Sequence, residues 1–110
     1  MVRVVIYVFV LSIGIAAASA AQDGKAAGEK VFADEKCALC HSIAGKGNAK
    51  GPLDEVGSKL SVDEIRAWMT DAKGMTEKTG ATRKPPMKAY TLPKADVDAL
   101  VAYLQTLKKK

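Results

Sequence analysis

The stretch Cys37-Ala38-Leu39-Cys40-His41 contains both cysteines and the only histidine of this 110-residue chain. Its CxxCH spacing is typical of covalent haem attachment. Two thiols three positions apart can each add across a haem vinyl group, and the adjacent imidazole is then held against the iron. We therefore predict one covalently attached haem c, bound through Cys37 and Cys40, with His41 as an iron ligand.

Other uses of paired cysteines fit the rest of the sequence less well. A structural disulfide needs no histidine, and a thioredoxin-like CxxC belongs at a strand-to-helix junction of a βαβ pattern, which we do not find. A structural zinc site needs four ligands, and the chain has no further cysteine or histidine to complete the set. A redox-active disulfide is the alternative that stays open.

The N-terminus has the composition of a secretory signal. Residues 1–3 carry a positive charge, an apolar run follows from Val4 to Ile15, and Ala18-Ser19-Ala20 is a small-residue cleavage site. We expect a signal over residues 1–20, a single domain over residues 21–110, and a soluble periplasmic protein. The alternative is an uncleaved membrane anchor, since the apolar stretch is near the lower length limit for a span.

The predicted domain is small and has few aromatic side chains with which to build a core. Domains of this size usually need a disulfide, a metal or another staple. A large apolar cofactor bonded at several points would supply it, so we expect the haem at the centre of the core. The aromatic residues beyond the signal are Phe32, Trp68, Tyr90 and Tyr103.

The periodicity predicts an all-α domain with three main helices. The first would run from a cap at Asp23 to about Asp34, and the last would begin near Pro93. The second would begin at a Ser61–Glu64 capping box and end at a glycine, Gly74. Apolar stripes lie on the second helix at Ile65, Trp68, Met69 and Ala72, and on the last at Val97, Leu100, Val101, Leu104 and Leu107.

Two long irregular segments, residues 42–60 and 74–92, separate these helices. Loops of this length are uncommon within a small domain unless they serve a function. They make sense here if they wrap around the haem.

The chain resembles the small monohaem class I cytochromes c of bacterial periplasms. The likeness implies the cytochrome c fold, in which three main helices and long loops surround a covalently bound haem. It also implies that the first and last helices cross, with Gly28, Phe32 and Tyr103 at the crossing. The matching pieces appear in family order as Gly28-Glu29-Lys30-Val31-Phe32, CALCH, Gly51-Pro52-Leu53, Pro86-Met87 and Asp98-Ala99-Leu100-Val101-Ala102-Tyr103-Leu104.

A thioether is the natural second ligand of the iron, because the chain has no second histidine. Met87 follows Pro85 and Pro86, which favour extended backbone before it, and it matches the position of the family's distal methionine. Met87 is therefore the expected ligand, although methionines more often fill gaps in a core. Met69 is expected to pack in the core, and Met75 is the reserve ligand.

The resemblance also suggests two groups around the haem. In relatives, the proline carbonyl of the Gly-Pro pair accepts a hydrogen bond from the haem-ligating imidazole, which assigns that role to Pro52. The indole N–H of Trp68 is a candidate donor to a haem propionate, and a packing role on its helix is the alternative.

Ligation by His41 and Met87 would close the iron and leave electron transfer as its task, so we expect an electron carrier and not an enzyme. The alternatives are a five-coordinate haem with peroxidase or gas-binding activity, and a haem subunit of a larger periplasmic dehydrogenase. The net charge of +5 favours redox partners with acidic surfaces, and no motif suggests nucleic-acid binding. Basic residues cluster in the predicted loops at Lys46, Lys50, Lys78, Arg83, Lys84 and Lys88.

Overall fold

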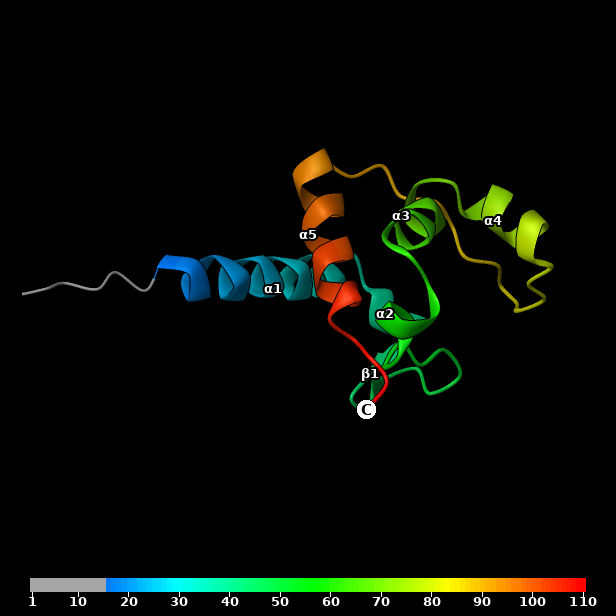
Figure 1. The fold of residues 1–110 in the computed structure, drawn as a ribbon. Helices are drawn as coiled ribbons and strands as arrows, with labels where there is room; N and C mark the ends of the chain where they lie inside the picture. Colours follow the sequence, from blue (N-terminus) through cyan, green and yellow to red (C-terminus); the bar gives the residue numbers. More distant parts are fainter. Residues whose placement is uncertain (1–15) are drawn as a thin grey trace, which may run out of the picture.

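The computed structural model describes residues 16–110, and the described part is mainly helical (Figure 1). The charged start and apolar run of the predicted signal lie outside the described residues, so the signal stays a prediction. None of the described helices is long and apolar enough to cross a membrane. The elements are α1 (Ala16–Asp34), a 3-10 turn η1 (Cys37–Leu39), β1 (Ser42–Ile43), β2 (Lys46–Gly47), α2 (Val56–Lys59), α3 (Val62–Thr70), α4 (Ala72–Thr79) and α5 (Lys94–Gln105).

The structure confirms the all-α prediction, with one small exception. β1 and β2 form an antiparallel hairpin of two residues per strand, which the sequence analysis did not anticipate. The prediction that the first helix begins at a cap at Asp23 was wrong. α1 begins at Ala16 and passes through Asp23, because the alanine-rich residues before it have high helix propensity.

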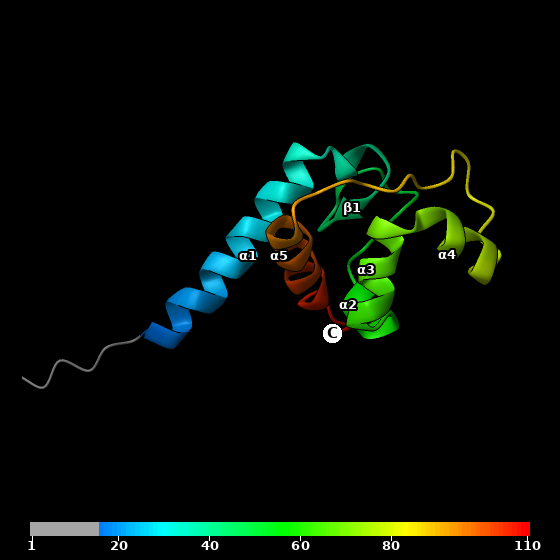
Figure 2. The same ribbon diagram turned by 90° about the horizontal axis from the view of Figure 1, so that it is seen from above.

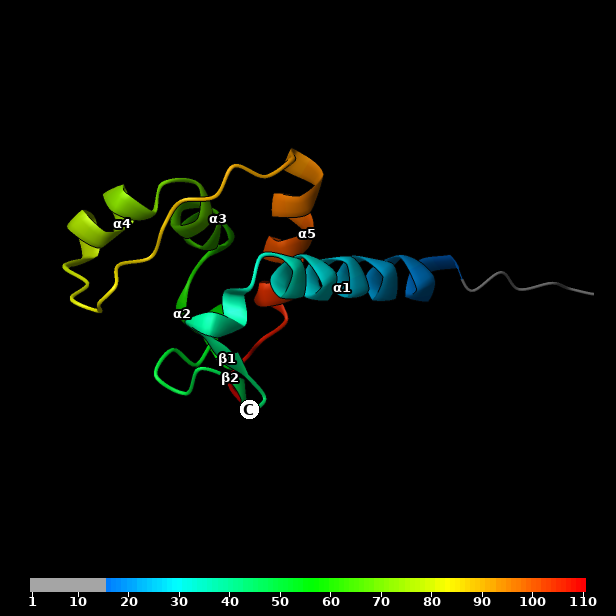
Figure 3. The same ribbon diagram turned by 180° about the vertical axis from the view of Figure 1, so that it is seen from behind.

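α1 and α5 cross at close range, as Figures 1 and 3 show from opposite sides. The crossing depends on Gly28, which is buried in α1. A Cβ atom at this position would overlap the carbonyl oxygen of Ala99 and the Cβ atom of Tyr103. One turn further, Phe32 meets Tyr103 edge to face, with ring centroids 6.5 Å apart and an interplanar angle of 81°. The crossing residues that the resemblance implied are confirmed.

We expect Gly28→Ala to lower the free energy of unfolding of the haem-loaded protein by about 1–3 kcal/mol, because the added methyl group overpacks the helix crossing. Gly24→Ala is the matched control, since a Cβ atom on Gly24 of the same helix meets nothing within 4 Å. The control should be neutral or gain up to about 1 kcal/mol from helix propensity. Guanidinium titration measures both variants, and equal effects would contradict this account of the crossing.

α3 begins as predicted and ends earlier. Ser61 Oγ accepts the Glu64 N–H at 3.2 Å, and Glu64 Oε1 accepts the Ser61 N–H at 3.1 Å, so the capping box is confirmed. The predicted end at Gly74 was wrong, because the chain breaks at Asp71 and continues as α4. Asp71 Oδ1 accepts the Gly74 N–H at 3.2 Å and thus caps the new helix. α4 ends at Gly80, which adopts the left-handed conformation that favours glycine.

The core lies between α1, α3 and α5, and α5 contributes most of its buried side chains. Figure 2 shows α1, α5 and α3 side by side, with the segment that joins α4 to α5 running back past α3. A backbone hydrogen bond from the Tyr90 N–H to the Met69 carbonyl, at 2.8 Å, ties this segment to α3. The buried core residues are Val31, Ile65, Met69, Val97, Leu100, Val101, Tyr103 and Leu104.

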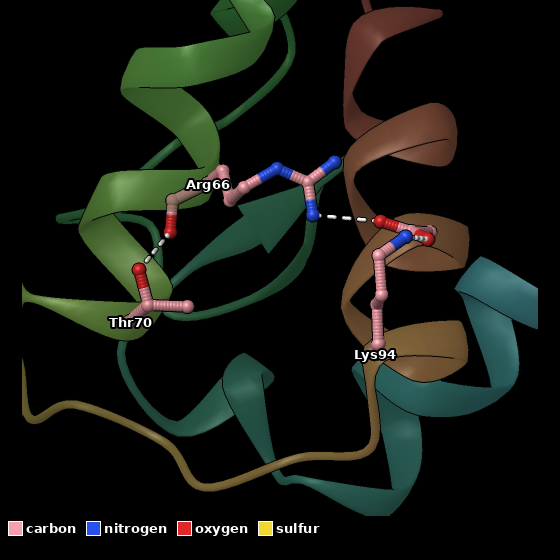
Figure 4. Close-up of polar contacts among 4 residues, drawn as sticks. Arg66, Thr70 and Lys94 are labelled. Carbon is pink, nitrogen blue, oxygen red and sulfur yellow. Dashed lines mark hydrogen bonds and ion pairs between the residues drawn. The ribbon is translucent and has the colours of Figure 1, made fainter.

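A small ion-pair network joins α3 to α5 on the surface (Figure 4). Asp98 accepts hydrogen bonds from Arg66 Nη1 and from Lys94 Nζ, each at 2.7 Å. These bonds lower the pKa of the Asp98 carboxyl, with Lys94 making the larger contribution. On the α3 side, the Thr70 hydroxyl donates to the Arg66 carbonyl at 3.0 Å. The network thus links α3 to α5 at the exposed surface.

The C-terminal residues pack against α2. The Gly57 N–H donates to the Leu107 carbonyl at 2.8 Å, and Lys108 Nζ donates to the Gly57 carbonyl at 2.7 Å. A Cβ atom on Gly57 would overlap the carbonyl oxygen of Gln105, so the close approach requires glycine.

Candidate haem site

The segment Cys37–His41 is held in a compact turn by its own backbone. The Cys40 and His41 N–H groups both donate to the Cys37 carbonyl, at 3.1 and 2.9 Å. Lys36, just before the turn, adopts the left-handed conformation with φ of 55° and accepts the Leu39 N–H at 3.1 Å. Hydrogen bonds within residues 36–41 thus fold the motif into a local turn.

Both cysteines are free thiols that line one cavity. Cys37 is partly buried and Cys40 is exposed. Burial, followed by the nearby Glu35 carboxylate, raises the pKa of the Cys37 thiol. Both influences favour the neutral thiol over the thiolate.

The cavity has a volume of about 690 Å³. This volume lies within the range of roughly 300–1,000 Å³ that is typical of cofactor and small-molecule sites. Aliphatic or aromatic side chains of α1, α2, α3 and α5 form part of its wall. Thr76 of α4 also lines the cavity. Its apolar lining includes Phe32, Leu53, Val56, Leu60, Ile65, Trp68, Met69, Leu92, Leu100 and Leu104.

His41 also lines the cavity, and the backbone fixes its ring. His41 Nδ1 lies 3.1 Å from the carbonyl oxygen of Gly51. Since a carbonyl can only accept, Nδ1 carries the proton and Nε2 keeps a free lone pair for a metal. Burial lowers the pKa of the imidazole, the Gly51 bond opposes this shift, and the charge of Arg83 adds to it. The lowered pKa favours the neutral imidazole, which is the form that can ligate a metal.

The acceptor of the His41 bond is Gly51 and not Pro52, which corrects the role that the resemblance assigned to Pro52. Residues 51–53 pair with Ser42 in a short parallel bridge. The Gly51 carbonyl accepts the Ser42 N–H at 3.0 Å, and the Leu53 N–H donates to the Ser42 carbonyl at 2.8 Å. Because carbonyls alternate in direction along extended backbone, the Pro52 carbonyl points away from this side. Pro52 itself is exposed and does not line the cavity.

The three methionines of the described residues differ in how they lie relative to the cavity and the core. Met87 is half-buried, lies on the long segment between α4 and α5, and lines the cavity. Met69 also lines the cavity but is part of the buried core, as predicted. Met75 is buried on α4 and is not among the cavity residues, which argues against it as the reserve ligand.

Trp68, Lys88 and Tyr90, whose side chains carry polar groups, also line the cavity. Trp68 is half-buried and contributes to the wall, so it is not part of the fully buried stripe of α3. Tyr90 also lines the cavity, with Lys88 Nζ 5.1 Å above its ring centroid. Burial and the nearby Cys37 and Cys40 raise the pKa of the Tyr90 hydroxyl. Sequence reasoning placed Tyr90 only among core aromatics, although its position three residues after Met87 is a signal for the site.

The residues of this cavity fit a covalently bound haem. One apolar cavity is lined by two free thiols, one imidazole with an available nitrogen and the thioethers of Met69 and Met87, and these are the donor types that hold haem c. Within residues 16–110, no group of three or more Cys, His, Asp or Glu side chains is arranged to hold another metal ion.

Residues 25–108 match the cytochrome c family, and the chain belongs to that family. The chain is also similar to cytochrome c oxidase subunit 2 of Alkalihalophilus pseudofirmus, with 28% identity over 90 residues. That match covers 74% of the chain and 25% of the relative, so the chain spans about a quarter of the length of this protein. No solved structure matches the chain.

Membership in the family establishes the cofactor and the broad role. Proteins of the cytochrome c family bind covalently attached haem c with its iron, and this family supports a haem-based role in electron transfer. The helical architecture and the cavity described above agree with the fold of the family.

We expect Gly47→Ala to disturb the site strongly. Gly47 has φ of 110°, and a Cβ atom there would overlap the carbonyl oxygen of His41. Gly45→Ala is the matched control, because Gly45 also has positive φ (78°) but nothing lies within 4 Å of its Cβ position. Both variants bear the backbone strain, whereas only Gly47→Ala overpacks the turn, so its loss of stability should exceed that of the control by about 1–3 kcal/mol.

Chemical denaturation of the two haem-loaded variants measures this difference. Equal losses of stability would show that the close approach of Gly47 to His41 does not matter to the fold of the site.

Proposed function

We propose that the protein is a soluble periplasmic carrier of single electrons, whose haem iron is ligated by His41 and Met87. The observation that supports this proposal best is that Cys37, Cys40, His41 and Met87 all line the same apolar cavity. His41 and Met87 come from segments far apart in the sequence, one beside η1 and the other between α4 and α5.

A bound haem supplies one-electron chemistry at its iron. In this proposal His41 and Met87 would both ligate the iron of a bound haem, so no position would be left open for a substrate. The neutral thioether of Met87 stabilises the reduced state and raises the reduction potential, and burial in an apolar cavity acts in the same direction. Ligands that stay in place during oxidation and reduction favour transfer to a partner protein over catalysis.

The charge around the cavity suggests the kind of partner. Lys36, Arg83 and Lys88 line the cavity with their basic groups, against one acidic group from Glu35. Basic side chains near the cofactor would steer the protein toward redox partners with acidic docking surfaces. The association rate with such a partner should fall as the ionic strength rises.

Met87→Ala tests the proposed ligand set. We expect the ferric protein to lose the weak Met-to-iron charge-transfer band and its reduction potential to fall, because the thioether no longer stabilises the reduced state. The matched control is Met75→Ala, which removes a buried methionine that does not line the cavity. The control should lose about 2–5 kcal/mol of stability and keep the band and the potential.

Ultraviolet-visible spectra and a potentiometric titration provide the readouts. An unchanged band in the Met87→Ala protein would remove Met87 as the ligand. Rapid carbon monoxide binding to the ferrous parent protein would favour a five-coordinate haem, and with it peroxidase or gas-binding activity.

A second candidate function is that of a haem subunit within a larger redox enzyme. The likeness to cytochrome c oxidase subunit 2 of Alkalihalophilus pseudofirmus favours it, because that protein is named as part of an oxidase. The same experiment also tests the alternative of a haem subunit of a larger periplasmic dehydrogenase. Size-exclusion chromatography of the protein from its native membranes and periplasm distinguishes the two: a free carrier elutes as a small protein, and a subunit elutes with its enzyme.

A further inference from the structure

Asn48 makes hydrogen bonds to three of the five residues of the haem-attachment segment. Its backbone N–H lies 3.0 Å from both the Ala38 and the His41 carbonyl oxygens, which share this donor. Its side-chain Nδ2 donates to the Leu39 carbonyl at 3.1 Å. One residue thus binds the carbonyls of Ala38, Leu39 and His41.

Asn48 also organises the turn that carries the His41 acceptor. Its side-chain Oδ1 accepts the Lys50 N–H at 2.9 Å, which is an Asx turn, and its carbonyl accepts the Gly51 N–H at 3.1 Å. The Gly51 carbonyl in turn accepts the proton of His41 Nδ1. Asn48 therefore bridges the segment that carries the imidazole and the carbonyl that orients it.

The chemistry of the asparagine side chain suits this position. The bridge uses the amide as a donor on one side and as an acceptor on the other, and aspartate or leucine could not do both. The backbone around Asn48 has little room to move, because Gly47 and Gly51 both lie too close to the attachment segment to accommodate a Cβ atom. The Asn48 side chain is half-buried, and both of its hydrogen bonds are exposed at the surface.

We propose that Asn48 is a positioning residue that tunes His41 by fixing the Gly51 carbonyl against the imidazole. The inference rests on the proposed function, because it takes His41 as an iron ligand. A hydrogen bond from the far nitrogen of a ligating imidazole raises its basicity, and a more basic ligand stabilises the oxidised iron. Loss of the Asn48 amide would loosen the turn, weaken the His41–Gly51 bond and raise the reduction potential.

Asn48→Leu, which is similar in size and uncharged, is the test variant, made in the full chain and loaded with haem. We expect its reduction potential to rise and the solvent exchange of the His41 Nδ1–H, followed by proton NMR of the ferrous protein, to become about fivefold faster. Ala49→Ser, an exposed and uncharged neighbour in the same turn, is the control and should change neither quantity.

Asn48→Ser is a milder second variant, which keeps a hydroxyl to accept the Lys50 N–H and should shift both quantities in the same direction by less. If the leucine variant is not recovered with haem, the serine variant decides. The proposal is overturned if the recovered variants keep the parent's potential and exchange rate, even where their melting temperature falls. A parent protein without a His41-ligated haem spectrum would overturn the proposed function as well, whereas unchanged variants of a ligated parent overturn this inference alone.

Discussion

An apolar cavity lies where a small domain would normally have its densest packing, and the rest of the structure is arranged around it. The cavity occupies about 690 Å³ and is lined from α1, η1, α2, α3, α5 and the long segments between them. A domain with so few aromatic side chains cannot fill this space by itself, and burial of apolar surface is the main source of folding free energy. The bound haem of this cytochrome c family member would complete the core, so the cofactor is part of the fold as well as the functional group.

Backbone hydrogen bonds set the geometry of the attachment site more than side-chain contacts do. The Cys37 carbonyl closes the turn on itself, and the bridge between Ser42 and Pro52 presents the Gly51 carbonyl to the imidazole. Such bonds tolerate little added volume, which is why glycine is required at Gly47 and Gly51. If His41 ligates the iron as proposed, a backbone held by these hydrogen bonds would suit electron transfer, because small structural change between oxidation states speeds the exchange.

The parts of the fold that depend on side-chain identity and spacing could be predicted from the sequence. The CxxCH motif identified Cys37, Cys40 and His41, and the capping box located the start of α3. A sequence pattern does not show in which direction each backbone carbonyl points. The hydrogen-bond acceptor for His41 was therefore assigned to Pro52 and not to Gly51, the residue before it, and the hydrogen bonds of Asn48 were not predicted. The break at Asp71 was missed because Ala72 continues the apolar stripe of α3 while it begins a new helix.

As a member of the cytochrome c family, this chain is expected to carry one haem through thioether bonds from both cysteines of its attachment segment. The most direct test is mass spectrometry and thiol titration of the denatured protein, after expression in an exporting host with the full machinery for cytochrome c maturation. We expect a chain heavier by one haem, with the colour retained in acidified organic solvent and no free thiol. A colourless chain with two titratable thiols would contradict it.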